Sequence, residues 1–335
     1  MSLENDTYSV TDVGESCVPY IFRCKSAPTV VKTRLQTAVI ADTVEYGPAL
    51  FIGDDMENLA IQSTMADEAI YHRAFVHGAA GLCRRAPTSA LVIGGGEGCM
   101  ARELLKYDTI EVIDQVDWDA ELLAYFKQPA VAAVWNGGAY EDPRVRVHVE
   151  DAFRSKVWEG KIYDLVLIDL CDPSAESIDD LRGLLRKLVY RCSWDGVLLM
   201  NVGPVAVPLV LDVKRGRTGP PGFYAREGHI CYTYSAELLE TMKILGGSDT
   251  FSFKLDVPSF KAPWCLVGIA KNNTIGKWAE GFIRGDELKA LMFYEPCYLD
   301  IYAQTNSQFC ISNEMKQLME EAEAKPKDYL LYNGC

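Results

Sequence analysis

The sequence predicts an α/β protein in which a doubly wound, mostly parallel sheet follows a small antiparallel sheet. From residue 89 to 200, short apolar runs rich in β-forming residues alternate with helical segments, which is the order of βαβ units. Before residue 60, two apolar runs flank the turn-forming triplet 46–48, which indicates a hairpin instead. We expect residues 1–80 to form an N-terminal arm, a hairpin sheet and a linking helix, and residues 81–335 to form the main domain.

Apolar periodicity places the individual elements in chain order. Strands are expected at 20–23, 35–41, 49–52, 90–93, 111–116, 145–149, 163–168, 196–200, 251–257 and 264–270, the last two as an antiparallel pair. Helices are expected at 64–77, 100–106, 120–126, 181–189, 235–245 and 314–324. The run 163–168 is almost entirely apolar after its first two residues, as in a strand buried on both faces.

A glycine-rich turn joins the strand 90–93 to the helix that follows it. The four glycines let the backbone turn sharply and leave room for a ligand, because they carry no Cβ: Gly94, Gly95, Gly96 and Gly98. Their spacing is not G-x-G-x-x-G and no G-K-[ST] follows, which argues against a dinucleotide or a P-loop triphosphate. Glu97 lies within the turn, where its carboxylate repels phosphate and suits a cation such as the sulfonium or amine of an S-adenosyl compound. The alternative is a turn that only connects two elements.

Composition excludes several classes of protein. A net charge of −14 argues against a nucleic-acid partner, which needs clustered Lys and Arg, and is compatible with a small cationic substrate. No apolar run reaches the ~18 residues that span a bilayer, and the N-terminus lacks the pattern of a signal peptide, so we expect a cytoplasmic protein without a membrane partner. Eleven cysteines without C-x-x-C, together with only four histidines, predict a reducing compartment and no metal centre.

Carboxylates follow the strand 163–168 at the sheet edge where open α/β proteins bind their ligands. Asp169 and Asp172 are therefore the best catalytic candidates, against the alternative that they form a helix cap and a turn. In the preceding helix, Asp67 and Tyr71 share a face, as do Glu68 and His72, because each pair is four residues apart. This polar row either lines the site or is a solvated helix face.

Contacts to a nucleoside are expected at two further strand ends. Asp114 and Asp117 lie about 20 residues past the glycines, where a ribose contact is usual, and Gln115 stands between them. Asp151, which follows the strand 145–149, can accept from an adenine amino group.

Six stretches, taken together and in this order, resemble the aminopropyltransferase (polyamine synthase) family, and most closely its thermospermine synthase and archaeal-type branch. They are DTVEYGPALFIGDD, Q-S-T-x-A-D-E-x-x-Y-H, GGGEG, Glu150-Asp151-Ala152, Asp169-Leu170-Cys171-Asp172-Pro173, and Val257-Pro258-Ser259-Phe260 with Trp264. The resemblance covers residues 34–325. It implies a Rossmann-like sheet of the class I methyltransferase type. It also implies transfer of the aminopropyl group of decarboxylated S-adenosylmethionine to a polyamine nitrogen, with release of methylthioadenosine and without a metal.

The resemblance, with the ribose window above, also implies which residues do this. The residues expected to bind the nucleoside and its aminopropyl arm are Gln36, Gln62, Gly94, Gly96, Glu97, Asp114, Gln115, Asp151 and Ala152. Asp169, with Tyr71 as the second catalytic residue, is expected to take the proton of the attacking amine. The residues expected to bind the small polycationic acceptor are Tyr71, His72, Asp172 and Trp264. By analogy with the family, we expect a homodimer or homotetramer assembled through the N-terminal sheet.

The chain departs from the family pattern at three places. Gln115 replaces the acidic residue at the ribose position, residues 174–183 are shorter and more acidic than the family's loop, and Asn201 stands where the branch has Gln. An amide still hydrogen-bonds hydroxyls but loses the charge-assisted component. Two alternatives therefore stay open: an S-adenosylmethionine-dependent N-methyltransferase on the same fold, and a non-catalytic paralogue that acts as a binding or scaffold protein.

Overall fold

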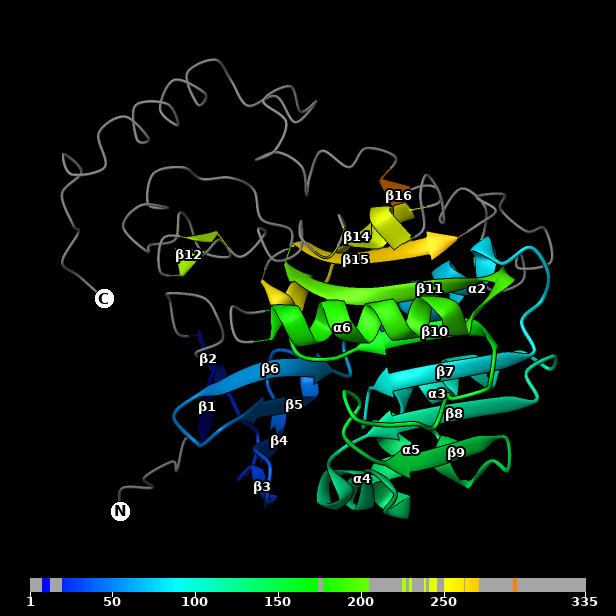
Figure 1. Ribbon diagram of the computed structural model, residues 1–335. Helices are drawn as coiled ribbons and strands as arrows, with labels where there is room; N and C mark the ends of the chain where they lie inside the picture. The colour runs from blue at the N-terminus through cyan, green and yellow to red at the C-terminus, as the bar shows by residue number, and fades with distance from the viewer. Residues whose placement is uncertain are drawn as a thin grey trace, which may run out of the picture.

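A large mixed sheet and a smaller antiparallel sheet are the two main bodies of the protein (Figure 1). The computed structural model describes residues 8–12, 20–173, 177–204, 225–226, 229–230, 238, 241–245, 250–261, 263–270 and 292–293. The predicted helix 314–324 lies outside these residues, and the predicted helix 235–245 lies only partly within them. No helix of the described part has the length and apolar character needed to cross a membrane.

The large sheet has the strand order β16-β14-β15-β11-β10-β7-β8-β9. Its parallel strands are β7 (Ser89–Gly94), β8 (Val112–Asp117), β9 (Val145–Val149), β10 (Tyr163–Asp169) and β11 (Cys192–Pro204). Three antiparallel strands extend it: β14 (Thr250–Asp256), β15 (Pro263–Ala270) and β16 (Met292–Phe293). The chain builds outward from β7 through β8 to β9 and then returns to place β10 on the other side of β7. The topological switch point, where such sheets bind ligands, therefore lies between β7 and β10.

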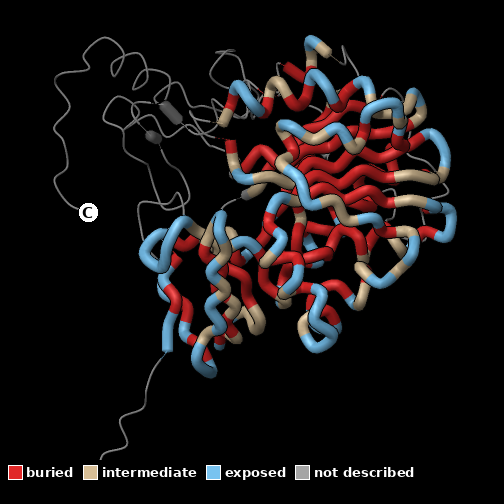
Figure 2. The backbone as a smooth tube through the Cα atoms, turned by 60° about the horizontal axis from the view of Figure 1, so that its bottom comes forward, coloured by how far each residue is buried: buried red, intermediate tan, exposed pale blue. Residues whose placement is uncertain are grey.

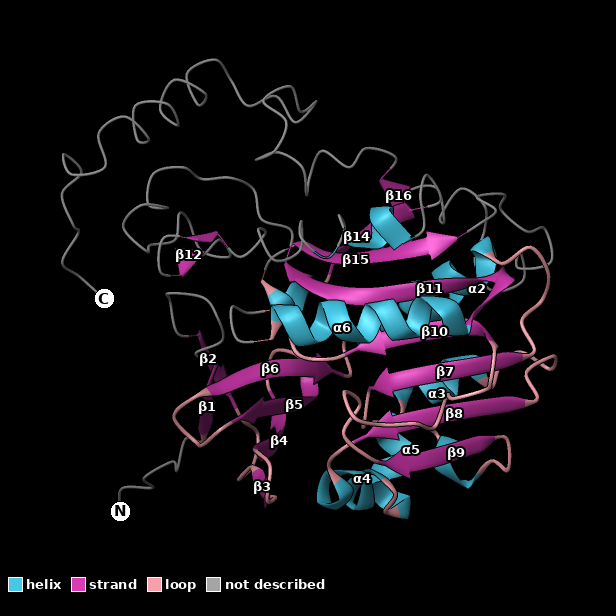
Figure 3. Cartoon of the chain, viewed as in Figure 1, coloured by secondary structure: helices cyan, strands magenta, loops and turns pink. Residues whose placement is uncertain are grey.

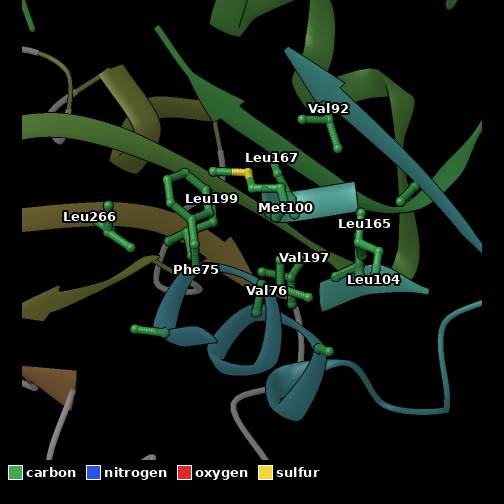
Figure 4. Packing of buried hydrophobic residues seen from close by; sticks show 14 of the residues in the cluster. Phe75, Val76, Val92, Met100, Leu104, Leu165, Leu167, Val197, Leu199 and Leu266 are labelled. Carbon is green, nitrogen blue, oxygen red and sulfur yellow. The ribbon is translucent and has the colours of Figure 1, made fainter. Parts of the chain in front are cut away.

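Helices cover both faces of this sheet (Figure 3). One face packs against α1 (Glu68–Arg73), a π-helical turn (Ala74–Gly78), α2 (Ala79–Leu82) and α3 (Cys99–Leu104). Figure 4 shows Val92, Leu165 and Leu199 of three neighbouring strands beside Phe75 and Met100 of these helices. The alternate residues of the same strands pack against α6 (Ile178–Leu188) on the other face. Apolar side chains on both faces explain why these strands are the most buried part of the molecule (Figure 2).

The small sheet has the order β3-β4-β5-β6 and is antiparallel throughout. Its strands are β3 (Thr29–Lys32), β4 (Thr37–Thr43), β5 (Gly47–Gly53) and β6 (Leu59–Thr64), and the nearby pair β1 (Ser9–Asp12) and β2 (Tyr20–Arg23) contributes Phe22 to the core of one face. The other face packs Ala38 and Leu50 against α4 (Ala120–Phe126) and α5 (Pro129–Trp135). These contacts bring the small sheet to the helices of the large one.

The predicted fold class is confirmed, and the differences are local. Thr64 ends β6 instead of capping a helix, because its hydroxyl donates to the Asp67 carboxylate at 2.6 Å. The helix begins at Glu68 and continues past the predicted end at 77, through the π-helical turn, to Leu82. Strand β11 is longer than predicted, and α5 was not predicted. The domain boundary at residue 80 stays a prediction, and α2 crosses it.

Candidate active site

The glycine turn and Asp169 meet at the switch point. The register of β7 and β10 pairs Gly94 with Asp169, at the carboxyl ends of both strands. Gly94 has φ of +83°, and a Cβ there would lie 2.0 Å from the Asp169 carbonyl oxygen, so both its conformation and its surroundings require glycine. A Cβ on Gly95 would lie 3.8 Å from Asp169 Oδ2. The Asp169 carboxylate therefore lies directly beside the turn.

Asp169 is paired with Tyr71 of α1. The Tyr71 hydroxyl donates to Asp169 Oδ1 at 2.6 Å, and the tyrosine is 5% exposed. Burial and the nearby charge of Glu97 raise the pKa of Asp169 to about 7, although the hydrogen bond from Tyr71 acts in the opposite direction. A carboxylate whose pKa lies near neutrality is suited to accept a proton in a reaction at pH 7.

A second pair of side chains fixes Glu97 within the turn. His72 Nε2 lies 2.9 Å from Glu97 Oε1, and His72 Nδ1 lies 2.8 Å from Glu68 Oε2. Burial alone would lower the pKa of His72, but the two carboxylates raise it to about 10. Glu97 thus stands in the turn as a carboxylate that contacts a buried imidazolium.

Gln115 of β8 holds the backbone of the glycine turn in place. Gln115 Nε2 donates to the carbonyl oxygens of Gly94 and Gly95 at 3.1 and 2.7 Å, and Tyr140 donates to that of Gly96 at 2.8 Å. Gln115 Oε1 is buried and has no hydrogen-bond partner among the described residues. A buried acceptor without a partner is costly, and a ligand hydroxyl would satisfy it.

Asp117 is the carboxylate of the ribose window that reaches the turn. A Cβ on Gly96 would lie 2.8 Å from Asp117 Oδ2. Burial raises the pKa of Asp117 to about 6 despite a hydrogen bond from the backbone of Asp119. The nucleoside contacts expected from the sequence do not include Asp117, although its place in the ribose window, at the carboxyl end of β8, is a signal that could have selected it.

Asp114, by contrast, is not brought to the turn. Its carboxylate accepts from His148, Lys161 and Tyr163 at 2.7–2.8 Å and is 1% exposed. Burial would raise the pKa of Asp114, but these three donors hold it below its usual value. Because neighbouring residues of a strand point to opposite faces, Asp114 and Gln115 cannot both reach the turn.

For four other residues expected at the nucleoside, no described contact reaches the glycine turn. Gln36 donates to Asp119 Oδ2 at 2.8 Å, which places it near the end of β8. Asp151 Oδ1 accepts from the backbone of Phe153 at 2.9 Å, and Ala152 is buried beside it. Gln62 is exposed and donates to the Ala60 carbonyl at 3.3 Å, so the structure does not bring its side chain to the turn.

On the other side of Asp169, Asp172 and Trp264 meet through Asn201. Asn201 Nδ2 lies 3.2 Å from Asp172 Oδ1, and Trp264 Nε1 donates to Asn201 Oδ1 at 2.8 Å. The Trp264 ring packs 4.7 Å from that of Phe260, which in turn lies 5.7 Å from Tyr71 between ring centroids. Three aromatic rings and one carboxylate thus form a wall beside Asp169, and such a wall suits an alkyl chain that carries an ammonium group.

One buried carboxylate ties this wall to α1. Asp67 accepts from the backbone nitrogen of Ser259 at 2.7 Å and from its hydroxyl at 2.9 Å. Both residues are buried, at 5% and 0% exposed, and they are 192 positions apart in the chain. The sequence pattern places Asp67 on the helix but gives no signal for its partner.

Three residues beside the glycine turn also have the composition of a cation site. His72, Glu97 and Asp169 each offer one donor atom, and these atoms lie within 4.8 Å of one another. Both ring nitrogens of His72 face carboxylates, so a metal ion would have to displace protons from an imidazolium. The arrangement therefore fits a hydrogen-bonded ion cluster better than a metal centre.

A parallel sheet with a glycine turn, an acidic residue in that turn and carboxylates at its switch point is the arrangement of an open α/β protein with its ligand site at the carboxyl ends of the strands. Residues 68–201 match the family described as "Spermine/spermidine synthase domain". The chain is 32% identical over 239 residues to a polyamine aminopropyltransferase of Synechococcus sp., covering 68% of this chain and 74% of that relative. The chain belongs to the polyamine aminopropyltransferase family.

Two further comparisons define the extent of the likeness. The chain is 32% identical over 204 residues to a polyamine aminopropyltransferase of Pyrobaculum neutrophilum, covering 56% of this chain and 65% of that relative, slightly less than two thirds of its length. A crystal structure of spermidine synthase in complex with the transition-state analogue AdoDATO has a TM-score of 0.63 and 16% identity, covering 96% of this chain and 97% of that one. That structural likeness establishes the fold.

Proposed function

We propose that this protein transfers the aminopropyl group of decarboxylated S-adenosylmethionine to an amine of a polyamine and releases methylthioadenosine. The observation that carries this proposal is Asp169, held by Tyr71 at the edge of the glycine turn, with a pKa near neutrality and with carboxylates on both sides. The spermidine synthase with AdoDATO and the named relatives support the same reaction class.

The two sides of Asp169 take different substrates in this proposal. The donor half consists of Glu97, His72, Gln115 and Asp117 around the glycine turn, where a nucleoside with a cationic arm meets carboxylates. His72, which the resemblance assigned to the acceptor, belongs to the donor half in this proposal because it contacts Glu97. The acceptor half consists of Asp172, Asn201, Phe260 and Trp264. There, an ammonium group of the polyamine pairs with Asp172 while its alkyl chain lies along the aromatic wall.

The chemistry needs a base and alignment. The lone pair of the attacking nitrogen forms a bond to the methylene carbon attached to sulfur. The carbon–sulfur bond breaks, and its electron pair stays on sulfur as the neutral thioether of methylthioadenosine. The proton that the nitrogen sheds goes to Asp169, whose second oxygen faces the turn while Tyr71 holds the first. Because a sulfonium is a good leaving group, alignment supplies much of the rate and no metal is required.

The product is the finer part of the proposal. The resemblance to the thermospermine and archaeal-type branch favours a triamine or tetraamine product: thermospermine, spermine or spermidine. We further propose that the protein acts in the cytoplasm and that it forms a homo-oligomer. Light scattering of the purified chain tests the oligomeric state.

An assay with decarboxylated S-adenosylmethionine tests the function directly. Purified protein is incubated with a panel of diamines and triamines, and methylthioadenosine and the polyamine product are measured by mass spectrometry. We expect stoichiometric methylthioadenosine and one elongated amine, and about a thousandfold slower product formation by Asp169→Asn. Methyl transfer from intact S-adenosylmethionine would favour the N-methyltransferase instead, and the absence of binding to any adenosyl ligand would favour the scaffold protein.

A further inference from the structure

We propose that Glu68, which lies behind the site, is a positioning residue. Its negative charge keeps His72 protonated on both ring nitrogens, and the doubly protonated ring holds the Glu97 carboxylate in place for the cationic arm of the donor. This inference rests on the proposed function for the identity of that cation, but the state of His72 does not depend on it.

The geometry of His72 requires two protons. Its two nitrogens lie 2.8 and 2.9 Å from carboxylate oxygens of Glu68 and Glu97, and the side chain is 3% exposed. A neutral imidazole has one N–H, so one of these contacts would set a lone pair against a carboxylate. Against two ionised carboxylates, both contacts are hydrogen bonds only when the ring is an imidazolium.

Glu68 is itself held as a carboxylate by Arg102. Arg102 Nη2 donates to both Glu68 oxygens, at 2.8 and 2.9 Å. The Glu68 side chain is 5% exposed and lies on the far side of His72 from Glu97. Arg102, Glu68, His72 and Glu97 therefore alternate in charge along one chain of contacts that ends in the glycine turn.

Other groups around His72 do not replace this role. The Tyr71 ring packs edge-on at 5.2 Å, and Cys99 and Asp169 each place one atom within 4.8 Å of a His72 nitrogen. Burial and several acidic neighbours keep the pKa of Cys99 well above its usual value, and burial raises that of Asp169 to about 7. If Glu68 loses its charge, Arg102 keeps its ion pair with Glu103, but His72 loses one of its two carboxylate partners and gives up its second proton more readily. The neutral ring then donates to Glu97 without the help of a positive charge, and its hold on that carboxylate weakens.

Glu103 offers a matched control. It is 2% exposed, accepts from the same Arg102 at 3.1 Å, and lies 2.8 Å from a ring nitrogen of another buried histidine, His77. The other nitrogen of His77 faces the Tyr107 hydroxyl, not the glycine turn. Glu103→Gln therefore removes a comparable buried charge without touching the donor half.

The test compares Glu68→Gln, Glu103→Gln and the wild type by calorimetry and NMR. At pH 8.5, we expect Glu68→Gln to bind decarboxylated S-adenosylmethionine about tenfold more weakly, as for one lost charge-assisted contact, while methylthioadenosine binding stays within about twofold. This difference in affinity between Glu68→Gln and the wild type disappears at pH 6, where His72 of the variant regains its second proton. Glu103→Gln shows no such pH-dependent gap, and Glu68→Asp, which keeps the charge, binds more tightly than Glu68→Gln.

Nitrogen-15 spectra of the histidine rings decide the matter without a ligand. We expect both His72 nitrogens to carry protons at pH 8.5 in the wild type and only one in Glu68→Gln. A doubly protonated His72 in that variant, or a singly protonated His72 in the wild type, overturns the inference, and the wild-type spectrum suffices if the variant does not fold. A wild type that binds no adenosyl ligand refutes the proposed function instead. The spectra still test whether Glu68 keeps His72 doubly protonated.

Discussion

The donor half and the acceptor half of the candidate site are assembled in different ways. Around the glycine turn, the side-chain hydrogen bonds join residues no more than 44 positions apart, from His72 and Glu68 to Tyr140 and Gly96. The acceptor half depends on contacts between distant segments, such as Tyr71 with Asp169 at 98 positions and Asp67 with Ser259 at 192. The donor half is a local structure on the first strands of the sheet, whereas the acceptor half exists only after the late antiparallel strands have packed against α1.

This difference has consequences for what each half can tolerate. The donor half is a dense network in which His72 and the Gln115 amide nitrogen each have two or more partners, so a single change disturbs a few contacts. The aromatic wall of the acceptor half depends on one carboxylate, Asp67, to hold its turn against α1. We therefore expect substitutions to separate the binding of the two substrates cleanly.

Asp169 lies between the halves and has the largest expected effect. Asp169→Asn removes the proton acceptor and keeps the shape, so we expect kcat to fall by about 10³-fold, in the range usual for loss of a general base, with little change in the binding of methylthioadenosine. Single-turnover assays and calorimetry measure the two quantities. A variant that retains more than about a tenth of wild-type kcat would remove Asp169 from the chemistry.

The same variant has a stability signature. The pKa of Asp169 is raised in the folded protein above its unfolded value, so the folded state holds the proton more tightly and stability falls as pH rises from about 4 to about 7. Asp169→Asn abolishes this loss. We expect its Tm to exceed that of the wild type at pH 8 and the difference to vanish near pH 4, as thermal denaturation at both pH values would show.

Asp67→Ala tests the acceptor half alone. It leaves the Ser259 backbone nitrogen and two buried hydroxyls without their acceptor, at a cost of about 1–3 kcal/mol for each buried group left unpaired. We expect the KM for the amine to rise about tenfold or more as Phe260 loses its place, with the Kd of methylthioadenosine unchanged. Ser259→Ala, which removes only the hydroxyl contact, serves as the milder comparison. Equal effects on both substrates would mean that the halves are not separate.

The contrast between the two halves also explains which parts of the fold and the site can be predicted from the sequence. The boundaries of α4 and β9 follow from apolar spacing and, for α4, from Asp119, whose side chain accepts from the Leu122 backbone. The glycine turn and Asp169 can be predicted because both follow buried strands whose order fixes the switch point. The partner of Asp67 cannot, since no local pattern encodes a contact across 192 positions. Gln62 shows the converse, because a residue named by resemblance alone is exposed and donates only to the nearby Ala60 carbonyl among the contacts described.

Gln115→Glu tests whether the donor half has adapted to an amide. On the family pattern alone, restoring the acidic residue adds a charge-assisted contact to the ribose. In this structure, however, it sets a carboxylate oxygen 2.7 Å from the Gly95 carbonyl and 3.1 Å from that of Gly94, where Nε2 now donates. We expect a lower Tm and several-fold weaker methylthioadenosine binding, with the amine KM unchanged. Tighter binding would show that the side chain turns its charge to the ribose and that the turn holds without the amide.

Tyr71→Phe has the smallest expected effect and concerns the contact that joins the halves. The Tyr71 hydroxyl lowers the pKa of Asp169 by donating to its carboxylate, so its removal raises that pKa further above 7. The acidic limb of the kcat/KM profile should move to higher pH by about half to one unit. Burial holds the pKa of Tyr71 itself well above its usual value, so the hydroxyl stays a donor throughout this range. At pH 9, where Asp169 is ionised in both proteins, the variant should approach wild-type activity. A profile that falls evenly at all pH values would instead mean that Tyr71 positions the acceptor amine and does not tune the base.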